Sequence, residues 1–310
     1  MSTEAKIKSA VIKRMEFHIS YDCQNNCIFC SEREQLNKYG SSFVDLKVIS
    51  KHLLAKKKVG LAHLTLTGGE PTLHPSFLAI LKKAKQLGFK TYTSTNGGRL
   101  FEDEFCRAAL PFLDEICFSL HGHTQELHNF HTKNPLSFGI LMKALENVKR
   151  LGKNNFIFFN IVVTRHNFES LKEIISLAAN LGAKQILISN LAPEGNALKN
   201  FKDLAVSLDK FSKKIPSLIS FAKNKKITIR FFGLPLCALR ENGIASNDLW
   251  WSPRLTIEKE KGGLRETRSF NPTRKRIKTE KCRACPKRKQ CGGVFKKYYQ
   301  EYGDFELMSF

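Results

Sequence analysis

Residues 15–30 read MEFHISYDCQNNCIFC, a short β-rich run that ends in three closely spaced cysteines. The run Met15–Tyr21 predicts a short strand. It is followed, in CxxxCxxC spacing, by Cys23, Cys27 and Cys30. Three thiolates this close can hold a soft metal centre, but they are one short of a closed tetrahedral set. An open coordination position is typical of a catalytic centre, although a zinc site with a distant fourth ligand fits the spacing as well.

Five more short apolar or β-rich runs follow this strand, and amphipathic helical runs separate them. The further strands are expected at Ala62–Thr67, Lys90–Thr95, Glu115–Leu120, Phe156–Val163 and Gln185–Asn190. The helices are expected at Phe43–Lys58, Phe77–Leu87, Phe138–Leu151 and Phe168–Leu181. This alternation gives six β/α units and implies a parallel sheet. Periodicity does not separate a partial barrel from a doubly wound open sheet.

Cap signals mark the ends of the expected helices. Ser42 with Asp45 predicts a capping box at the start of the first helix. A glycine lies just past each helix and just before a strand, where it suits the left-handed cap conformation: Gly60, Gly88, Gly152 and Gly182.

Polar segments follow the ends of all six expected strands. They are the cysteine loop, Gly68–Pro71, Thr95–Gly97, Ser119–Gly122, Asn160–Arg165 and Ser189–Asn190. A single loop residue of this kind often satisfies only its own backbone. Because the carboxyl ends of parallel strands meet at one edge of the sheet, six coinciding segments predict an active site there.

Two motifs in this order resemble those of one enzyme family. The CxxxCxxC loop, with the aromatic Phe29 before its last cysteine, and the TGGEP segment Thr67–Pro71 resemble the cluster and GGEP motifs of radical S-adenosylmethionine (radical SAM) enzymes. The resemblance covers most of the chain. It implies an α/β fold, a partial (β/α)6 TIM-type barrel with a small cysteine-rich C-terminal extension. The expected organisation is a lead-in at 1–14, a core barrel at 15–225 and an auxiliary-cluster extension at 226–310.

The resemblance implies that Cys23, Cys27 and Cys30 are the catalytic ligands of a 4Fe-4S cluster whose open iron binds S-adenosylmethionine. Reductive cleavage of this cofactor releases methionine and a 5′-deoxyadenosyl radical, which abstracts hydrogen from an unreactive carbon. The protein then has to position the cofactor and exclude water and oxygen.

The GGEP segment is expected to bind the methionine part of the cofactor. The resemblance implies that Glu70 would accept a hydrogen bond from the ammonium group, and that the main-chain carbonyls of Gly68 and Gly69 would assist it, with Pro71 next in the motif. The two glycines let the backbone approach a ligand closely.

Five further residues are expected around the cofactor. Asn96 and Ser119 would contact the ribose or the carboxylate, and Arg165 would hold the carboxylate in a bidentate fork. Phe29 and Ile188 would sandwich the adenine. A solvated loop is the alternative for Arg165, and ordinary core packing is the alternative for Phe29 and Ile188.

A histidine-rich stretch follows the fourth strand and contains His121, His123, His128 and His131. Its spacing is irregular, so we expect no metal site there. His121 alone is expected to face the substrate side.

A second cysteine group lies near the C-terminus. Cys282, Cys285 and Cys291 form a CxxCx5C set, and Cys237 is the natural fourth ligand. The group resembles the auxiliary-cluster extensions called SPASM or twitch domains. Phe295 occupies the position where the full SPASM pattern has another cysteine, so one auxiliary iron–sulfur cluster, a 4Fe-4S cluster, is expected. Four thiolates also suit a structural zinc ion, which stays the alternative.

The formal net charge of the chain is +23, and residues 253–297 hold 16 Lys or Arg against 4 acids. These cations could offset the charge of a thiolate-bound cluster, attract an acidic substrate or a nucleic acid, or form a solvated surface. No recognised RNA-binding motif accompanies them.

The chain is expected to be cytoplasmic. No apolar stretch reaches the roughly 20 residues of a membrane span, and Met1–Lys13 has no apolar run typical of an export signal. Free thiols are the norm in a reducing cytosol, and Cys106 and Cys117 are expected to be buried and inert.

The resemblance implies, as the first hypothesis, a peptide or protein substrate, since members with such extensions commonly modify peptides. The basic residues of the segment 253–297 could attract an acidic substrate. A cofactor-biosynthesis enzyme acting on a small molecule is the second hypothesis. A flavodoxin- or ferredoxin-type electron donor is implied, and no membrane partner. The hypothesis from another class is a zinc-bearing nucleic-acid or protein interaction module, which leaves the GGEP segment without an explanation.

Overall fold

The computed structural model describes residues 12–152 and 156–307 of the 310-residue chain. Most of the expected lead-in, residues 1–11, lies outside these ranges. Among the described residues, no helix is both long enough and apolar enough to cross a membrane.

A nine-stranded sheet forms the centre of the protein, in the order β7-β6-β5-β4-β3-β2-β1-β8-β9. Neighbouring strands are parallel except in the antiparallel β8–β9 hairpin. The strands are β1 Arg14–Ser20, β2 His63–Gly68, β3 Lys90–Thr95, β4 Glu115–Ser119, β5 Phe156–Val162, β6 Gln185–Ser189, β7 Thr228–Phe232, β8 Arg254–Glu260 and β9 Gly263–Ser269. The six predicted strands are all present, each within one residue of its expected ends, whereas β7, β8 and β9 were not predicted.

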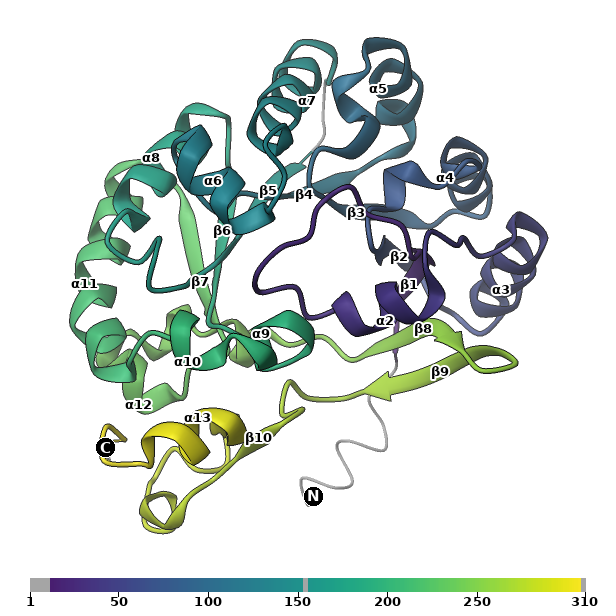
Figure 1. The fold of residues 1–310 in the computed structure, drawn as a ribbon. Coiled ribbons are helices and arrows are strands. Elements are labelled where there is room, and N and C mark those ends of the chain that lie inside the picture. Colours follow the sequence, from purple (N-terminus) through teal and green to yellow (C-terminus); the bar gives the residue numbers. More distant parts are fainter. Residues whose placement is uncertain (1–11, 153–155, 308–310) are drawn as a thin grey trace.

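Helices cover the outer face of the curved sheet (Figure 1). Those that connect successive parallel strands are α3 Leu46–Lys58, α4 Phe77–Gln86, α5 Asp103–Ala109, α7 Ser137–Leu151, α8 Leu171–Asn180 and α11 Leu208–Asn224. The loop between β1 and α2 (Arg33–Tyr39) crosses the barrel opening (Figure 1). A doubly wound sheet would carry helices on both faces. The fold is therefore the partial TIM-type barrel.

Shorter helical segments lie in the loops and were not predicted. They are α6 Gln125–Thr132, α9 Gly195–Lys199, α10 Phe201–Leu204, α12 Leu236–Leu239 and α13 Lys296–Tyr302, with 3₁₀ turns η1 Pro71–Leu73, η2 Gly98–Phe101, η3 Leu110–Phe112, η4 Arg240–Ala245, η5 Asn247–Trp250 and η6 Glu280–Cys282.

The predicted capping box before the first long helix is wrong. Asp45 is itself the N-cap, because its carboxylate accepts hydrogen bonds from the backbone of the first helical turn. The helix α3 therefore begins at Leu46, after the predicted start at Phe43. The Ser42 hydroxyl instead lies 2.8 Å from the ammonium nitrogen of Lys259 on the hairpin.

Three of the four predicted glycine caps are left-handed, with φ of 90° at Gly60, 72° at Gly88 and 92° at Gly182. The prediction for Gly152 is wrong, because its φ is −76°. Its N–H still closes α7 by donating to the Val148 carbonyl at 2.7 Å, so the helix ends without a left-handed residue.

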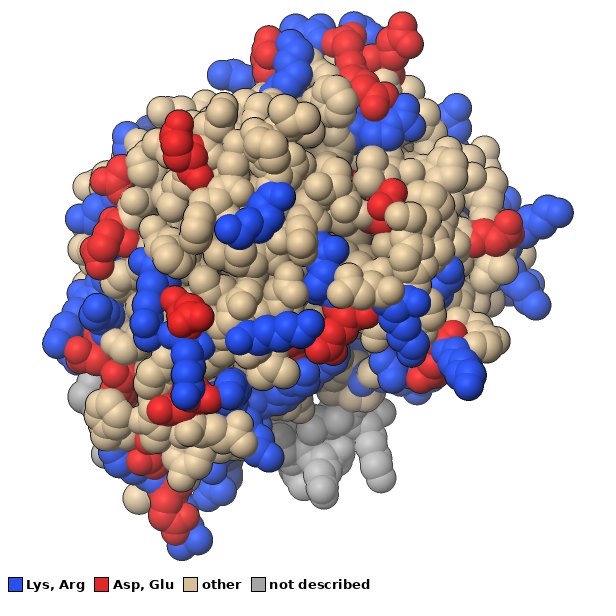
Figure 2. Space-filling view, in the orientation of Figure 1, with Lys and Arg blue, Asp and Glu red and all other residues tan. Residues whose placement is uncertain are grey.

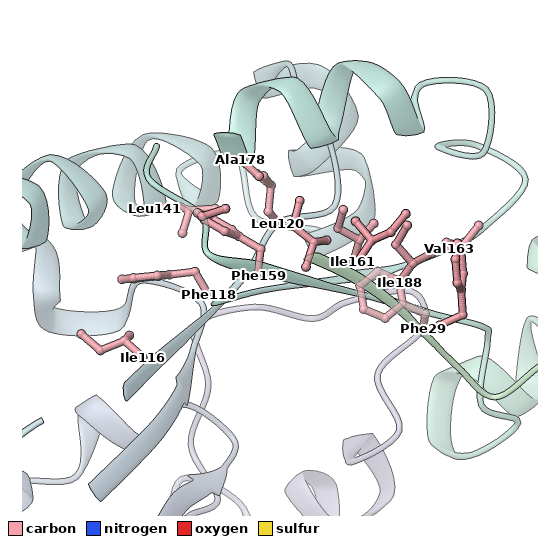
Figure 3. Packing of buried hydrophobic residues seen from close by; sticks show 14 of the residues in the cluster. Phe29, Ile116, Phe118, Leu120, Leu141, Phe159, Ile161, Val163, Ala178 and Ile188 are labelled. Carbon is pink, nitrogen blue, oxygen red and sulfur yellow. The ribbon is translucent and has the colours of Figure 1, made fainter. Parts of the chain in front are cut away.

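The main core lies between the sheet and the helices (Figure 3). Successive strand residues point to opposite faces, and the outward-facing Phe118, Phe159 and Ile161 are fully buried near Leu141 of α7 and Ala178 of α8. The intervening residues of each strand face the barrel interior, which decides which side chains can reach the site.

The sheet continues across residue 225, where the expected division between core and extension falls, because β7 and β8 both join it. Beyond the hairpin, β10 (Arg276–Ile277) and β11 (Val294–Phe295) form a separate two-stranded sheet. The buried Tyr298 of α13 ties this segment to the barrel, since its hydroxyl accepts the backbone N–H of Leu208 at 2.9 Å. The domain division itself stays a prediction.

We expect Phe159→Ala to lower the free energy of unfolding by about 3–5 kcal/mol, because it removes a fully buried ring and leaves a cavity. Phe156 on the same strand is 42% exposed, so Phe156→Ala is the matched control and should cost less than about 1 kcal/mol. Urea denaturation of both variants measures the difference; equal losses would mean that the face assignment of β5 is wrong.

Candidate functional site

A cavity of about 300 Å³ opens at the carboxyl ends of the barrel strands. Each of the six polar segments expected from the sequence contributes at least one residue to its wall. The contributors are Cys23, Cys27 and Cys30 of the cysteine loop, Gly68–Glu70, Thr95 and Asn96, Ser119 and His121, Asn160, and Ser189 and Asn190. Phe232 at the end of β7, which the sequence did not indicate, completes this wall.

Neighbouring elements hold the cysteine loop in place. The backbone N–H groups of Asn26 and Ile28 donate to carbonyls at the end of α6, both at 2.9 Å. From the other side, Asn196 Nδ2 donates to the Cys27 carbonyl at 2.9 Å, and Asn200 Nδ2 donates to the Ile28 carbonyl at 2.8 Å. The loop is therefore fixed by residues about 100–170 positions away in sequence, which no local pattern indicates.

The three thiols face the cavity and none forms a disulfide. Burial raises the pKa of the Cys23 thiol to about 12, and it also raises the pKa values of Cys27 and Cys30. The guanidinium of Arg33 acts in the opposite direction and favours the thiolate form of each. A bound metal centre would favour the thiolate form further, because thiols that coordinate a metal are deprotonated.

Among the described residues, no three His, Cys, Asp or Glu side chains are grouped closely enough to hold one metal ion. A cluster of several irons binds each cysteine through a different iron, so its ligands lie farther apart than those of a single ion. Three thiols border one cavity, and this is a set of ligands that an iron–sulfur cluster can use.

The two glycines of the GGEP segment allow close contacts within the chain. A Cβ on Gly68 would lie 2.3 Å from the Ser20 carbonyl oxygen, and one on Gly69 would lie 2.2 Å from the Asp22 carbonyl oxygen. The Gly69 and Glu70 N–H groups donate to these same two carbonyls, at 2.8 and 2.7 Å. These contacts to the end of β1 explain why both positions need glycine, and both glycines also border the cavity.

Glu70 is 1% exposed and its carboxylate is already engaged. Oε1 accepts from the N–H and hydroxyl of Thr72, at 3.1 and 2.6 Å, and from the Thr95 hydroxyl at 2.8 Å. Oε2 accepts from the Asn96 N–H at 2.8 Å. Burial raises the pKa of this carboxyl, and these donors oppose the rise. Glu70 thus fixes the end of β3, and only Oε2 retains capacity for a ligand ammonium.

Asn96 and Ser119 both border the cavity, as the expected ligand contacts require. The Asn96 side chain, however, also reaches the cysteine loop: Nδ2 lies 3.5 Å from Cys23 Sγ, and Oδ1 accepts from Gln24 Nε2 at 2.7 Å. Pro71 does not line the cavity, since it is buried as the first residue of η1.

Two expected cofactor contacts lie elsewhere and are corrections. Arg165 is exposed; its Nε donates to the Ala205 carbonyl at 2.7 Å, and its Nη2 donates to the Tyr302 hydroxyl at 3.2 Å. Ile188 is fully buried in the outer core (Figure 3) because strand alternation turns Ser189, and not Ile188, into the cavity.

Phe29 does line the cavity, and its ring packs edge-on against His121 with centroids 4.5 Å apart. His121 also borders the cavity, as expected of a residue on the substrate side. His128 Nε2 pairs with the Ser137 hydroxyl at 3.2 Å, and His131 is held between backbone and hydroxyl groups. These bonds hold the buried rings of His128 and His131 against neighbouring parts of the chain.

The structure brings the second cysteine group together. Cys237, Cys282, Cys285 and Cys291 border one small void of about 20 Å³. Cys291 Sγ accepts backbone N–H groups at 3.4 and 3.3 Å, from Leu236 and Gly293. Four basic side chains also line this void: Lys278, Lys281, Lys287 and Arg288.

A groove of about 820 Å³ continues from the cavity, with which it shares Ser31, Ala192 and Phe232. We call it the hairpin groove, because the β8–β9 hairpin and residues 270–274 form its far side. Basic and acidic side chains both line it: Arg254, Arg265, Arg268, Arg274 and Arg276, with Glu16, Glu32, Glu194 and Glu258.

Most of the groove arginines are neutralised by the protein. Arg254 pairs with Glu16, Arg265 with Glu258, Arg276 with Asp248, and Arg274 with Glu194 at 3.1 Å. Arg268 has no ion pair among the described residues. Figure 2 likewise shows basic and acidic side chains interspersed around the edge of the face that carries the barrel opening.

Comparison with known proteins identifies the family of the chain. The sequence model described as the radical SAM superfamily matches residues 17–178, slightly more than half of the chain. A relative named probable GTP 3′,8-cyclase from Saccharolobus islandicus (strain M.14.25 / Kamchatka #1) is 29% identical over 195 residues, 62% of this chain and 61% of the relative. One of the same name from Sulfurisphaera tokodaii is 27% identical over 225 residues, 71% of this chain and 67% of the relative. The match thus spans less than two thirds of the first relative.

Solved structures share the fold. Streptococcus suis SuiB bound to S-adenosylmethionine superposes with a TM-score of 0.66 over 96% of this chain and 77% of SuiB, at 16% identity. The protein anSMEcpe with bound AdoMet and Kp18Cys peptide gives a TM-score of 0.57 over 70% of this chain and 63% of anSMEcpe, at 17% identity. At these identities the likeness concerns the fold alone.

We expect Gly69→Ala to destabilise the protein by about 1–3 kcal/mol, because the added Cβ collides with the Asp22 carbonyl and forces the cysteine loop to shift. Gly139→Ala is the matched control: nothing lies within 4 Å of its Cβ position on α7, and alanine should add about 0.5–1 kcal/mol. Urea denaturation compares them, and an unchanged midpoint for Gly69→Ala would contradict the close approach.

Proposed function

The chain belongs to the radical SAM superfamily, and from that premise we propose that it binds S-adenosylmethionine in the cavity and modifies a peptide or protein. Members of this superfamily are enzymes that use a 4Fe-4S cluster and S-adenosylmethionine. The observation that carries the proposal is that three half-buried thiols and the GGEP segment border one cavity at the carboxyl ends of the strands.

Cys23, Cys27 and Cys30 hold the cluster in this proposal, and their number leaves one position open for the cofactor. When bound and reduced, the cluster supplies the electron that splits S-adenosylmethionine and so generates the radical that takes hydrogen from the substrate. The protein's own residues position the reactants. Glu70 fixes the end of β3, Asn96 and Ser119 present polar groups to the cofactor, and the packed ring of Phe29 keeps water from the thiols.

The second cysteine group is proposed to hold one auxiliary iron–sulfur cluster, in a twitch-like extension. Its support is that all four predicted thiols border the same void although Cys237 is 45 positions before Cys282 in sequence. A structural zinc ion is the alternative that metal analysis of the purified protein distinguishes. A flavodoxin- or ferredoxin-type donor would reduce the first cluster.

The hairpin groove supports a peptide substrate. It is large, it is continuous with the cavity, and its charges are nearly balanced because four of its five arginines already pair with carboxylates. A nucleoside triphosphate needs several unpaired cations to replace its counterions, and no Lys or Arg lines the cavity itself. A polar, extended chain fits such a surface better. Arg268 is the one cation available to an acidic residue of that chain, within the described part of the groove.

A small-molecule substrate is the second candidate, and the relatives named probable GTP 3′,8-cyclase favour it. A nucleoside triphosphate requires unpaired cations, whereas a polar peptide fits the nearly balanced charges of the hairpin groove.

We expect anaerobically reconstituted protein to release 5′-deoxyadenosine from S-adenosylmethionine and a strong reductant, and Cys27→Ala to abolish this release. Cys106→Ala is the matched control, since that thiol is fully buried in α5, away from the cavity, and its loss should leave release unchanged. Mass spectrometry measures the product. Release by Cys27→Ala at the wild-type rate would refute the assignment of the first cysteine group.

With the same reconstituted protein, we expect GTP to remain unconsumed, while members of a synthetic peptide library change mass in the presence of S-adenosylmethionine and reductant. Liquid chromatography with mass spectrometry follows both compounds in one incubation. Conversion of GTP to a cyclic product would instead establish the small-molecule alternative.

A further inference from the structure

Asn96 links the end of β3 to the first cysteine of the cysteine loop. Its amide Nδ2 lies 3.5 Å from Cys23 Sγ, within reach of an N–H···S hydrogen bond. Among the described residues, no other side chain hydrogen-bonds the sulfur of Cys23, Cys27 or Cys30.

The orientation of this amide is fixed by its other partners. Oδ1 accepts from Gln24 Nε2 at 2.7 Å and from the Gly98 N–H at 3.0 Å. Two donors at one end of the amide require the oxygen there, so the NH₂ end faces the sulfur.

The backbone that carries Asn96 is also fixed. Its N–H donates to the buried Glu70 carboxylate at 2.8 Å. The following residues, Gly97 and Gly98, have φ of 105° and 36°. A Cβ on Gly98 would lie 1.8 Å from the Thr72 hydroxyl oxygen, so this turn packs directly on the Glu70 network. The donor is therefore held in place before any ligand binds.

A hydrogen bond to a cysteine sulfur is one of the means by which a protein sets the potential of an iron–sulfur cluster. The donor stabilises negative charge on the sulfur, and this charge is greater in the reduced state. Such a bond therefore favours the reduced state and raises the reduction potential.

We infer that Asn96 is a positioning residue that raises the reduction potential of the cluster held by Cys23, Cys27 and Cys30, through the hydrogen bond from its amide to Cys23 Sγ. This inference rests on the proposed function. It gives Asn96 a role in addition to the cofactor contact expected from the sequence, because a single planar amide can meet the sulfur and still border the cavity.

The test is the midpoint potential of the reconstituted protein, measured by redox titration with detection by electron paramagnetic resonance. The signal of the first cluster is the one missing from Cys27→Ala. In Asn96→Ala, the equilibrium constant for reduction should fall about tenfold, which corresponds to a shift of about 59 mV to more negative potential for one electron. Asn180→Ala is the matched control, because it removes an exposed asparagine amide at the end of α8 that does not line the cavity; its midpoint should be unchanged.

A second readout separates tuning from a structural role. At saturating S-adenosylmethionine and with a weak reductant, Asn96→Ala should release 5′-deoxyadenosine more slowly than wild type, and this difference should become smaller with a stronger reductant. Asn96→Leu, which also lacks the donor, provides the same measurement if the alanine variant fails to load iron. A wild-type midpoint in the iron-loaded variants would overturn the inference while leaving the proposed function intact. A wild-type protein that assembles no cluster on the first cysteine group would overturn both.

Discussion

The buried carboxylate of Glu70 is the interaction on which the geometry of the site depends. A carboxylate without a cationic partner is tolerated in a protein interior only when hydrogen-bond donors surround it. Here four donors from Thr72, Thr95 and Asn96 do so. Removal of any of these donors would leave the buried carboxylate with a missing hydrogen bond. The network therefore holds the end of β2 against the end of β3. The Asn96 amide then carries that constraint to Cys23 in the cysteine loop.

Side chains from the other barrel strands form the remaining walls of the cavity. Each parallel strand sends every second side chain inward, so Ser119, Asn160 and Ser189 reach one cavity from three neighbouring strands. The hairpin β8–β9 and the C-terminal segment then extend this cavity into the hairpin groove. Because four of the five arginines with which the basic run lines the groove are paired with carboxylates, its high formal charge does not become a free cationic surface there.

Much of this could be predicted because parallel strands bring their carboxyl ends to one edge. This geometry predicts the convergence of the six polar segments. The strand positions and the grouping of Cys237 with the C-terminal cysteines follow from the pattern and spacing of residues along the chain. The errors concern properties that a local pattern does not contain. Ile188 was assigned to the wrong face of β6, and Arg165 is engaged by Ala205 and by Tyr302 on a distant helix.

The sequence by itself determined the β/α alternation, the spacing of both cysteine groups and the family, because periodicity and spacing are properties of the chain. Only the tertiary structure decided what each site residue touches. The GGEP glycines lie close to the end of β1, and the Glu70 carboxylate accepts a hydrogen bond from the chain itself. Asn196 and Asn200 donate hydrogen bonds to the cysteine loop. These contacts join residues far apart in sequence, and they exist only once the curved sheet has formed, its helices have packed on the outer face and the direction of each side chain is fixed.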